Sequence, residues 1–179
     1  MKKGPQPKCE EFVFSKDNVR NLRTVLACSK NILICGIKGV GKITNTINAV
    51  RDNTNVHYVG NPVDFEGKTR PGSYDKYLRY ISSMKKDIAI VGRIEDLFSV
   101  KDNIILIIDE LYGRGGAQLD QIGRILDMKN IQVLQIVGCI KYTGRIIEKM
   151  DVVVELHMDG AFVIDKELAQ AICRILGTD

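Results

Sequence analysis

One short stretch near the amino terminus combines glycine and lysine in a spacing suited to holding a phosphate group. It matches the pattern G-x-x-x-x-G-K and reads Gly36-Ile37-Lys38-Gly39-Val40-Gly41-Lys42. Glycines allow backbone N–H groups to turn inward around a phosphate chain, and the start of a following helix adds partial positive charge. Lys42 would supply a full positive charge to the β- and γ-phosphates of a nucleotide. The stretch therefore predicts nucleotide binding, and the alternative is a glycine-rich turn that binds nothing.

The residue after Lys42 departs from this pattern. Serine or threonine is expected there because its hydroxyl binds Mg²⁺, but the chain has Ile43 and carries Thr44 one residue further on. A shift of one residue along a helix rotates the side chain by about 100°. Thr44 would therefore reach the ion only if the loop adjusts, and the ion could otherwise depend on water and acidic residues. We expect this departure to affect hydrolysis more than nucleotide binding, to which Ile43 and Thr44 would both contribute.

An acidic pair, Asp109 and Glu110, follows the most apolar run of the chain, residues 104–108. A carboxylate at the carboxyl end of a buried strand can hold Mg²⁺ directly or through water. An adjacent glutamate points elsewhere and can orient or deprotonate an attacking water molecule. The pair thus predicts Asp109, with Thr44, as metal ligands and Glu110, with Lys42, as catalytic residues. The alternative is two solvated acids that simply end a strand.

Apolar runs and helical periodicity predict the elements that must position these residues. Strands are expected over residues 32–35, 56–59, 88–91, 104–108 and 131–137, and helices over 16–29, 41–50, 75–84, 93–100 and 119–126. Ser15 is the expected N-cap of the first helix. Apolar segments on either side of Asp159-Gly160 predict a β-hairpin, and a helix over 167–176 is expected to follow it. This alternation predicts an α/β fold, a three-layer sandwich with a mostly parallel central sheet.

Composition places the chain among ordinary globular proteins. It has 179 residues, 45% hydrophobic and 27% charged, with a net charge of +4. One domain over residues 11–179, after a flexible segment 1–10, is the expected organisation. The five cysteines form no C-x-x-C pair, which argues against structural zinc and a disulfide framework and favours the cytoplasm. No apolar run reaches the length of a membrane span or signal peptide, so we expect no membrane partner.

Together the two motifs resemble those of P-loop NTPases with a catalytic glutamate, the group that includes AAA+ ATPases and HerA/FtsK-like motors. The resemblance runs from about Leu22 to Leu156 and rests on residues 36–42 (Walker A) and Asp109-Glu110 (Walker B). It implies an extra strand between the P-loop strand and the Walker B strand, ATP as substrate and Mg²⁺ as cofactor. A complete AAA+ module carries a long helical lid, whereas only a hairpin and one helix are expected after Leu156. The pattern is therefore closer to small HerA/FtsK-like or viral genome-packaging ATPases.

The same resemblance implies a polar sensor on a further strand and an arginine that completes the site of a neighbouring subunit in a homo-oligomeric ring. Candidate sensors on or after residues 131–137 are Gln135, Cys139 and Lys141. Candidate arginines are Arg114, Arg124 and Arg145. The alternatives are a hydrogen-bonded core amide for Gln135 and a solvated surface position for each arginine.

Three functions remain open at this point. The leading hypothesis is an ATPase that couples ATP hydrolysis to movement or remodelling on nucleic acid. Aromatic residues make up only 6% of the chain, so we expect lysine and arginine to grip the nucleic-acid backbone instead of rings that stack on bases. The alternatives are a P-loop small-molecule or nucleotide kinase and a nucleotide-binding module that does not hydrolyse, which Ile43 makes credible. The lack of a guanine-reading N-K-x-D motif favours ATP over GTP.

Overall fold

The computed structural model describes residues 17–60, 73–109, 116–138 and 144–165, with positions 167, 170, 171 and 174 beyond them. The described strands form one sheet of seven strands in the order β3-β2-β4-β5-β1-β6-β7. Every neighbouring pair is parallel except β6 with β7. The strands are β1 (Asn31–Cys35), β2 (Val56–Gly60), β3 (Ala89–Ile90), β4 (Ile104–Asp109), β5 (Ile131–Ile136), β6 (Val152–His157) and β7 (Gly160–Ile164).

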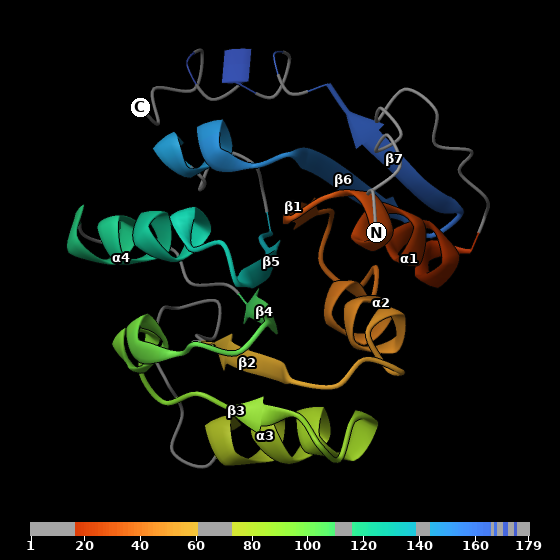
Figure 1. Cartoon of the computed structure of the whole chain (residues 1–179). Coiled ribbons are helices and arrows are strands. Elements are labelled where there is room, and N and C mark those ends of the chain that lie inside the picture. The colour runs from red at the N-terminus through yellow and green to blue at the C-terminus, as the bar shows by residue number, and fades with distance from the viewer. Residues whose placement is uncertain are drawn as a thin grey trace, which may run out of the picture.

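Helices cover both faces of this sheet, which confirms the predicted three-layer α/β sandwich (Figure 1). One face carries α1 (Asn18–Cys28), α2 (Lys42–Ala49) and α3 (Ser73–Met84), and the other carries α4 (Gly116–Asp127) with the 3₁₀ helices η2 (Ile94–Ser99) and η4 (Gly144–Lys149). The α2-side core between sheet and helices includes Leu22, Ile47, Ile81 and Ile107. The α4-side core includes Leu97, Ile108, Ile122 and Ile147.

Strand β1 shows why short apolar runs become central strands here. All five of its residues are buried. Ile32 and Ile34 belong to the α2-side core, whereas Leu33 and Cys35 belong to the α4-side core. A parallel strand with helices on both faces needs apolar side chains at successive positions, because it has no solvated side. The continuous aliphatic runs of the sequence therefore fit strands in the middle of a covered sheet.

The order of the strands brings the two sequence motifs to one edge of the sheet. Strand β5 lies between β1 and β4 and pairs in parallel with both. This is the position of the extra strand that the resemblance to P-loop NTPases implies. Because the carboxyl ends of parallel strands meet at the same edge, the loop after β1 and Asp109 at the end of β4 share that edge.

Two local predictions differ from the structure. The N-cap of α1 is Asp17 and not Ser15: the Asp17 Oδ1 accepts hydrogen bonds from the backbone N–H groups of Val19 (2.9 Å) and Arg20 (3.1 Å). Serine and aspartate both cap helices well, so propensity alone does not distinguish Ser15 from Asp17. The helix expected over 93–100 is a 3₁₀ helix, η2, because its short span closes i to i+3 bonds such as Val100 N–H to the Leu97 carbonyl (3.2 Å).

The remaining elements follow the prediction closely. The hairpin at Asp159-Gly160 is confirmed by the antiparallel pairing of β6 with β7, and the other strands and helices lie within a few residues of their expected ranges. The flexible segment predicted for residues 1–10 and most of the helix predicted over 167–176 lie outside the described residues. Within the described part of the chain, no helix combines the length and the apolar character needed to cross a membrane.

Candidate functional site

The loop between β1 and α2 has the backbone conformation that its glycines were expected to permit. Gly36, Gly39 and Gly41 all have positive φ angles, of 141°, 88° and 79°. A Cβ atom on Gly36 would lie 2.5 Å from the backbone carbonyl oxygen of Leu156 at the end of β6. Gly36 is therefore fixed by two independent requirements, the left-handed conformation and the close approach of a neighbouring backbone. The loop turns sharply and leads directly into α2, which begins at Lys42.

The Lys42 ammonium group lies inside this loop. Its Nζ donates hydrogen bonds to the backbone carbonyl oxygens of Gly36 (2.9 Å) and Ile37 (3.2 Å). Val40 anchors the loop from beneath, because its side chain is buried in the α2-side core. A cation held at a helix N-terminus by exchangeable carbonyl partners can turn to an anion without moving the backbone. The geometry therefore suits a phosphate group.

Asp109 lies at the end of β4 and is 6% exposed. Its side chain is on the α2 side of the sheet, because its register partner Ile136 belongs to the α2-side core, as does Ile107, two residues earlier in β4. Two phenols donate hydrogen bonds to its Oδ2, Tyr58 at 2.9 Å and Tyr77 at 2.6 Å. Hydrogen bonds to an ionised acceptor are shorter and stronger than neutral ones, so this carboxylate is firmly held.

Tyr58 reaches Asp109 by lying over a glycine. A Cβ atom on Gly60, two residues along β2, would lie 2.3 Å from the Tyr58 hydroxyl oxygen. Burial raises the pKa of the Tyr58 hydroxyl, and the negative charge of Asp109 raises this pKa further. Tyr58 therefore stays protonated as a hydrogen-bond donor, and Gly60 leaves the space in which it donates.

The hydroxyl of Thr44 is engaged by a residue of α3. Thr44 Oγ1 shares a 3.0 Å hydrogen bond with the Tyr80 hydroxyl of α3. Ile43 is partly buried and packs against the α2-side core, so the position of the usual hydroxyl holds an aliphatic side chain. None of the hydrogen bonds described for these residues joins Thr44 to Asp109. Each of the two predicted metal ligands is thus hydrogen-bonded to a tyrosine of α3, Asp109 to Tyr77 and Thr44 to Tyr80.

The residues present fit Mg²⁺ bound with a nucleotide better than Mg²⁺ bound alone. Within residues 17–60, 73–109, 116–138 and 144–165, no three His, Cys, Asp or Glu side chains gather closely enough to hold a metal ion. Mg²⁺ commonly takes one or two carboxylates and completes its shell with water and substrate phosphates. Asp109 and a phosphate chain at Lys42 would meet that requirement. They share the same edge and the same face of the sheet.

Gln135, the described candidate sensor, is not brought to this place. Its register partners Leu33 and Ile108 both belong to the α4-side core, so its side chain lies on the face of the sheet away from Asp109. The side chain is 1% exposed, and its Oε1 has no hydrogen-bond partner among the described residues. The alternation of a strand decides this placement: a residue next to Ile136 in sequence faces the opposite way. Gln135 thus lies on the opposite face of the sheet from Asp109, and its role as a sensor stays a prediction.

The described arginine candidates also lie on the α4 side of the sheet. Arg124 of α4 lies over the Phe98 ring, with its guanidinium carbon 4.0 Å from the ring centroid, on the α4 side of the sheet. Arg145 is an exposed residue of η4 on that side. Glu110, Arg114, Cys139 and Lys141 lie outside the described residues. The site that the structure describes therefore consists of the phosphate loop, Asp109 and three tyrosines.

Sequence reasoning missed the three tyrosines. Tyr58 carried a signal that could have been used, because a buried phenol normally finds a polar partner and Gly60 follows it two residues later. Tyr77 and Tyr80 are spaced three apart, which puts them on one face of a helix, and their ring centroids are 6.4 Å apart. Nothing in that spacing pointed to Asp109 as the group that this face would contact.

Comparison with known proteins does not establish a function for this chain. No protein-family model matches the chain, and no curated protein matches it. Among solved structures, the chain is similar to a structure of C. elegans PCH-2, with 16% sequence identity and a TM-score of 0.41. The match covers 80% of this chain and 40% of that chain, so this chain spans less than half of its length. A likeness at this level carries no argument about function.

Proposed function

We propose that this chain binds ATP together with Mg²⁺ and hydrolyses it, coupling hydrolysis to mechanical work or remodelling on nucleic acid. The observation that carries the proposal is the Lys42 ammonium held inside a loop of positive-φ glycines, at the edge and on the face of the sheet where Asp109 lies. The strand order, with β5 between β1 and β4, supports the same proposal.

Each residue has a separate role in this proposal. Lys42 exchanges the carbonyl oxygens of Gly36 and Ile37 for phosphate oxygens. Asp109 would hold the metal ion, which when bound would supply positive charge to the phosphates, and Glu110 would orient the attacking water and take its proton. The positive φ angles of the glycines let the loop backbone turn toward a phosphate chain.

Two substitutions test these roles by different measurements. Lys42→Ala is expected to weaken ATP binding about 10- to 100-fold in calorimetry, because a charged hydrogen-bonding partner is lost. Glu110→Gln is expected to bind ATP normally and to lower phosphate release by at least about 100-fold. Lys101→Ala is the matched control, since Lys101 is an exposed lysine before the amino end of β4. Normal turnover by Glu110→Gln would show that the proposed mechanism is wrong.

A specific observation also favours a second function, nucleotide binding without hydrolysis. Ile43 supplies no oxygen, and the hydroxyl of Thr44 is bonded to Tyr80. A binding module predicts tight ATP binding with negligible phosphate release, with or without DNA or RNA. Phosphate release without an added acceptor, in contrast, would argue for the ATPase and against the kinase considered from the sequence.

The coupling to nucleic acid needs its own measurement. Phosphate release is measured with no polymer, with single-stranded DNA, with duplex DNA and with RNA, at low and at high salt. Backbone contacts by lysine and arginine predict stimulation that fades as salt rises, because bound counterions are released on binding. A mass measurement with and without ATP tests the proposed homo-oligomer in parallel. Stimulation by none of the polymers would remove nucleic acid from the proposal and leave ATP hydrolysis standing.

A further inference from the structure

One helix, α3, contributes two phenols that form hydrogen bonds with Asp109 and Thr44. Tyr77 of α3 donates to Asp109 Oδ2 at 2.6 Å, and the Tyr80 hydroxyl is 3.0 Å from Thr44 Oγ1. Asp109 and Thr44 are the two residues that the sequence marks as metal ligands. Both are thus engaged by phenols from the same face of the same helix.

The bonding of Asp109 leaves no room for a cation on one of its oxygens. A carboxylate oxygen offers about two lone-pair positions, and Oδ2 already accepts two phenolic hydrogens, from Tyr58 and Tyr77. A cation that binds Oδ2 must displace one of them. Tyr58 is the more firmly fixed of the two, because it lies in the central sheet and is 0% exposed. Tyr77 is only partly buried, so it is the phenol that can leave.

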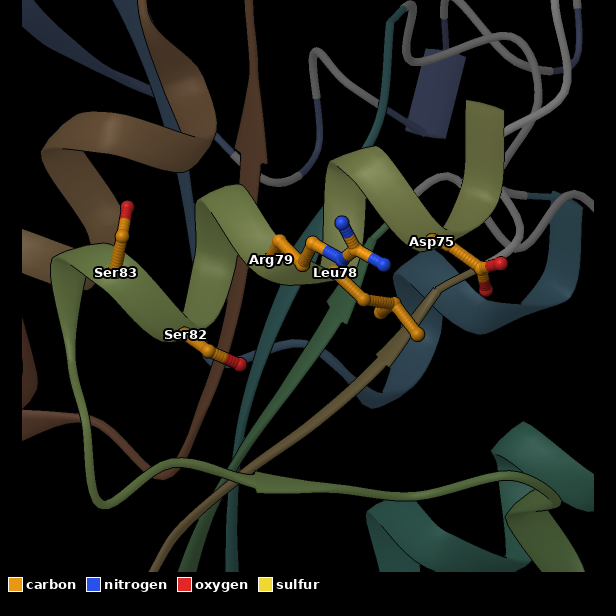
Figure 2. Close-up of a pocket in the computed structure, with 5 residues that line it drawn as sticks. All are labelled: Asp75, Leu78, Arg79, Ser82 and Ser83. Atoms are coloured by element: carbon orange, nitrogen blue, oxygen red, sulfur yellow. The ribbon is translucent and has the colours of Figure 1, made fainter. Parts of the chain in front are cut away.

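The construction of α3 allows such a release. Its carboxyl-terminal half is anchored: Ile81 is fully buried, and Lys85, just after the helix, donates to the backbone carbonyls of Arg51 (3.2 Å) and Asn53 (2.8 Å). The face of α3 that carries Asp75, Arg79 and Ser83 is exposed to solvent. Figure 2 shows the side chains along this face, which line a hollow of about 530 Å³: Asp75, Leu78, Arg79, Ser82 and Ser83. Leu78 also packs against the α2-side core, and Tyr77 and Tyr80 supply polar attachments from α3 to the site.

We propose that Tyr77 and Tyr80 form a latch that holds α3 against the empty site and that binding of Mg²⁺ with a nucleotide opens. This inference rests on the proposed nucleotide binding and adds the element through which binding is transmitted. Asp109 would hold the ion on Oδ2 in place of the Tyr77 hydroxyl, and Thr44 would turn from Tyr80 toward it. The helix then remains anchored at Ile81 and Lys85 while its amino-terminal half is freed.

Linkage gives the latch two reciprocal consequences. If the ligand loosens α3, then loosening α3 must tighten the ligand by the same factor. Tyr77→Phe keeps the ring and removes the hydroxyl, so it is expected to lower the dissociation constant for Mg²⁺-nucleotide on the order of tenfold. Tyr80→Phe removes a neutral and more exposed bond, and its expected effect is about threefold.

The experiment combines amide hydrogen exchange over residues 73–84 with calorimetric binding of a non-hydrolysable ATP analogue. Exchange is measured without ligand, with analogue plus Mg²⁺ and with analogue plus EDTA. Wild-type α3 is expected to exchange faster with Mg²⁺-analogue, and to stay unchanged with analogue plus EDTA because no metal reaches Asp109. Tyr77→Phe is expected to exchange fast without ligand and to gain little on loading.

The matched control is Ser83→Ala, which also removes one hydroxyl hydrogen bond from α3. Ser83 Oγ donates to the backbone carbonyl of Tyr80 at 2.7 Å, within the helix, and so does not reach the site. This variant is expected to keep the wild-type response of α3 to Mg²⁺-analogue and the wild-type affinity.

The outcomes separate the latch from the function on which it rests. Failure of wild-type protein to bind the analogue would sink both. Normal binding with α3 exchange unchanged or slowed by Mg²⁺-analogue would sink the latch alone. Weaker Mg²⁺-dependent binding by Tyr77→Phe would also overturn the latch, because it would mean that Tyr77 positions Asp109 for the ion instead of competing with it.

Discussion

The two halves of the candidate site are built in different ways. The phosphate loop is a local structure: its glycines, Lys42 and the start of α2 are contiguous in the sequence, and most of its contacts stay within a few residues. The surroundings of Asp109 are assembled from β2, α3 and β4, so that Tyr58, Tyr77 and Asp109 meet only in the folded chain. A local site can be read from a pattern of residues, whereas an assembled site depends on register.

The difference also changes what each half can do. The loop presents Lys42 with backbone carbonyl partners that a phosphate can replace at little cost. Asp109 is already satisfied by two phenols in a buried place, so a ligand must offer more than those bonds. Phosphate binding and metal binding are therefore separable steps, and substitutions in each half should affect different measurements.

The largest effect is expected in the loop, from Gly36→Ala. The new methyl group would meet the Leu156 carbonyl oxygen at 2.5 Å, and the residue would keep a φ of 141° that side chains rarely adopt. We expect the free energy of unfolding to fall by about 2–4 kcal/mol, since strain and overpacking add. Urea unfolding measures this loss, and calorimetry should show nucleotide affinity falling with it. An unchanged midpoint and affinity would mean that the loop does not lie against β6.

The next largest effect is expected beside Asp109, from Gly60→Ala. The added methyl group would lie 2.3 Å from the Tyr58 hydroxyl oxygen and would push it away from Asp109. We expect a loss of about 2–3 kcal/mol in unfolding free energy, from overpacking together with the lost hydrogen bond. Unlike the loop variant, it should leave metal-free nucleotide binding intact. If metal-free binding fell as far as it does in Gly36→Ala, the two halves would not be separable.

How far the sequence determines each half follows from these contacts. The loop, the hairpin at Asp159-Gly160 and the central strands could be predicted, because each follows from residue types within a short window. The contacts of Asp109 could not be predicted in this way. Tyr58 meets Asp109 through the register of β2 with β4, and Tyr77 meets it through the packing of α3 on the sheet, and neither is fixed by residue types within a short window. The N-cap at Asp17 is a smaller case, because serine and aspartate have nearly equal capping propensities.

A smaller effect is expected when the hydroxyl of Tyr58 is removed without adding volume. Tyr58→Phe leaves Tyr77 as a donor to Asp109 Oδ2, so the unfolding free energy should fall by about 1.5 kcal/mol, the lower end for a bond to a charged group. Gly60→Ala should cost less when combined with Tyr58→Phe than in the wild type, because the hydroxyl that the new methyl group strikes is gone. Additive costs in this double-mutant cycle would mean that Tyr58 does not lie over Gly60.

The smallest effect is expected from Gly39→Ala, which isolates the backbone term in the loop. Gly39 has a φ of 88°, but a Cβ atom there would meet nothing within 4 Å, so only the conformational cost applies. That cost is about 1 kcal/mol for a residue in the left-handed region. Urea unfolding should therefore place Gly39→Ala well above Gly36→Ala in stability, although both sit in the same glycine-rich loop. Equal losses would show that contact with Leu156 adds nothing, and that the whole loop is held by its backbone angles alone.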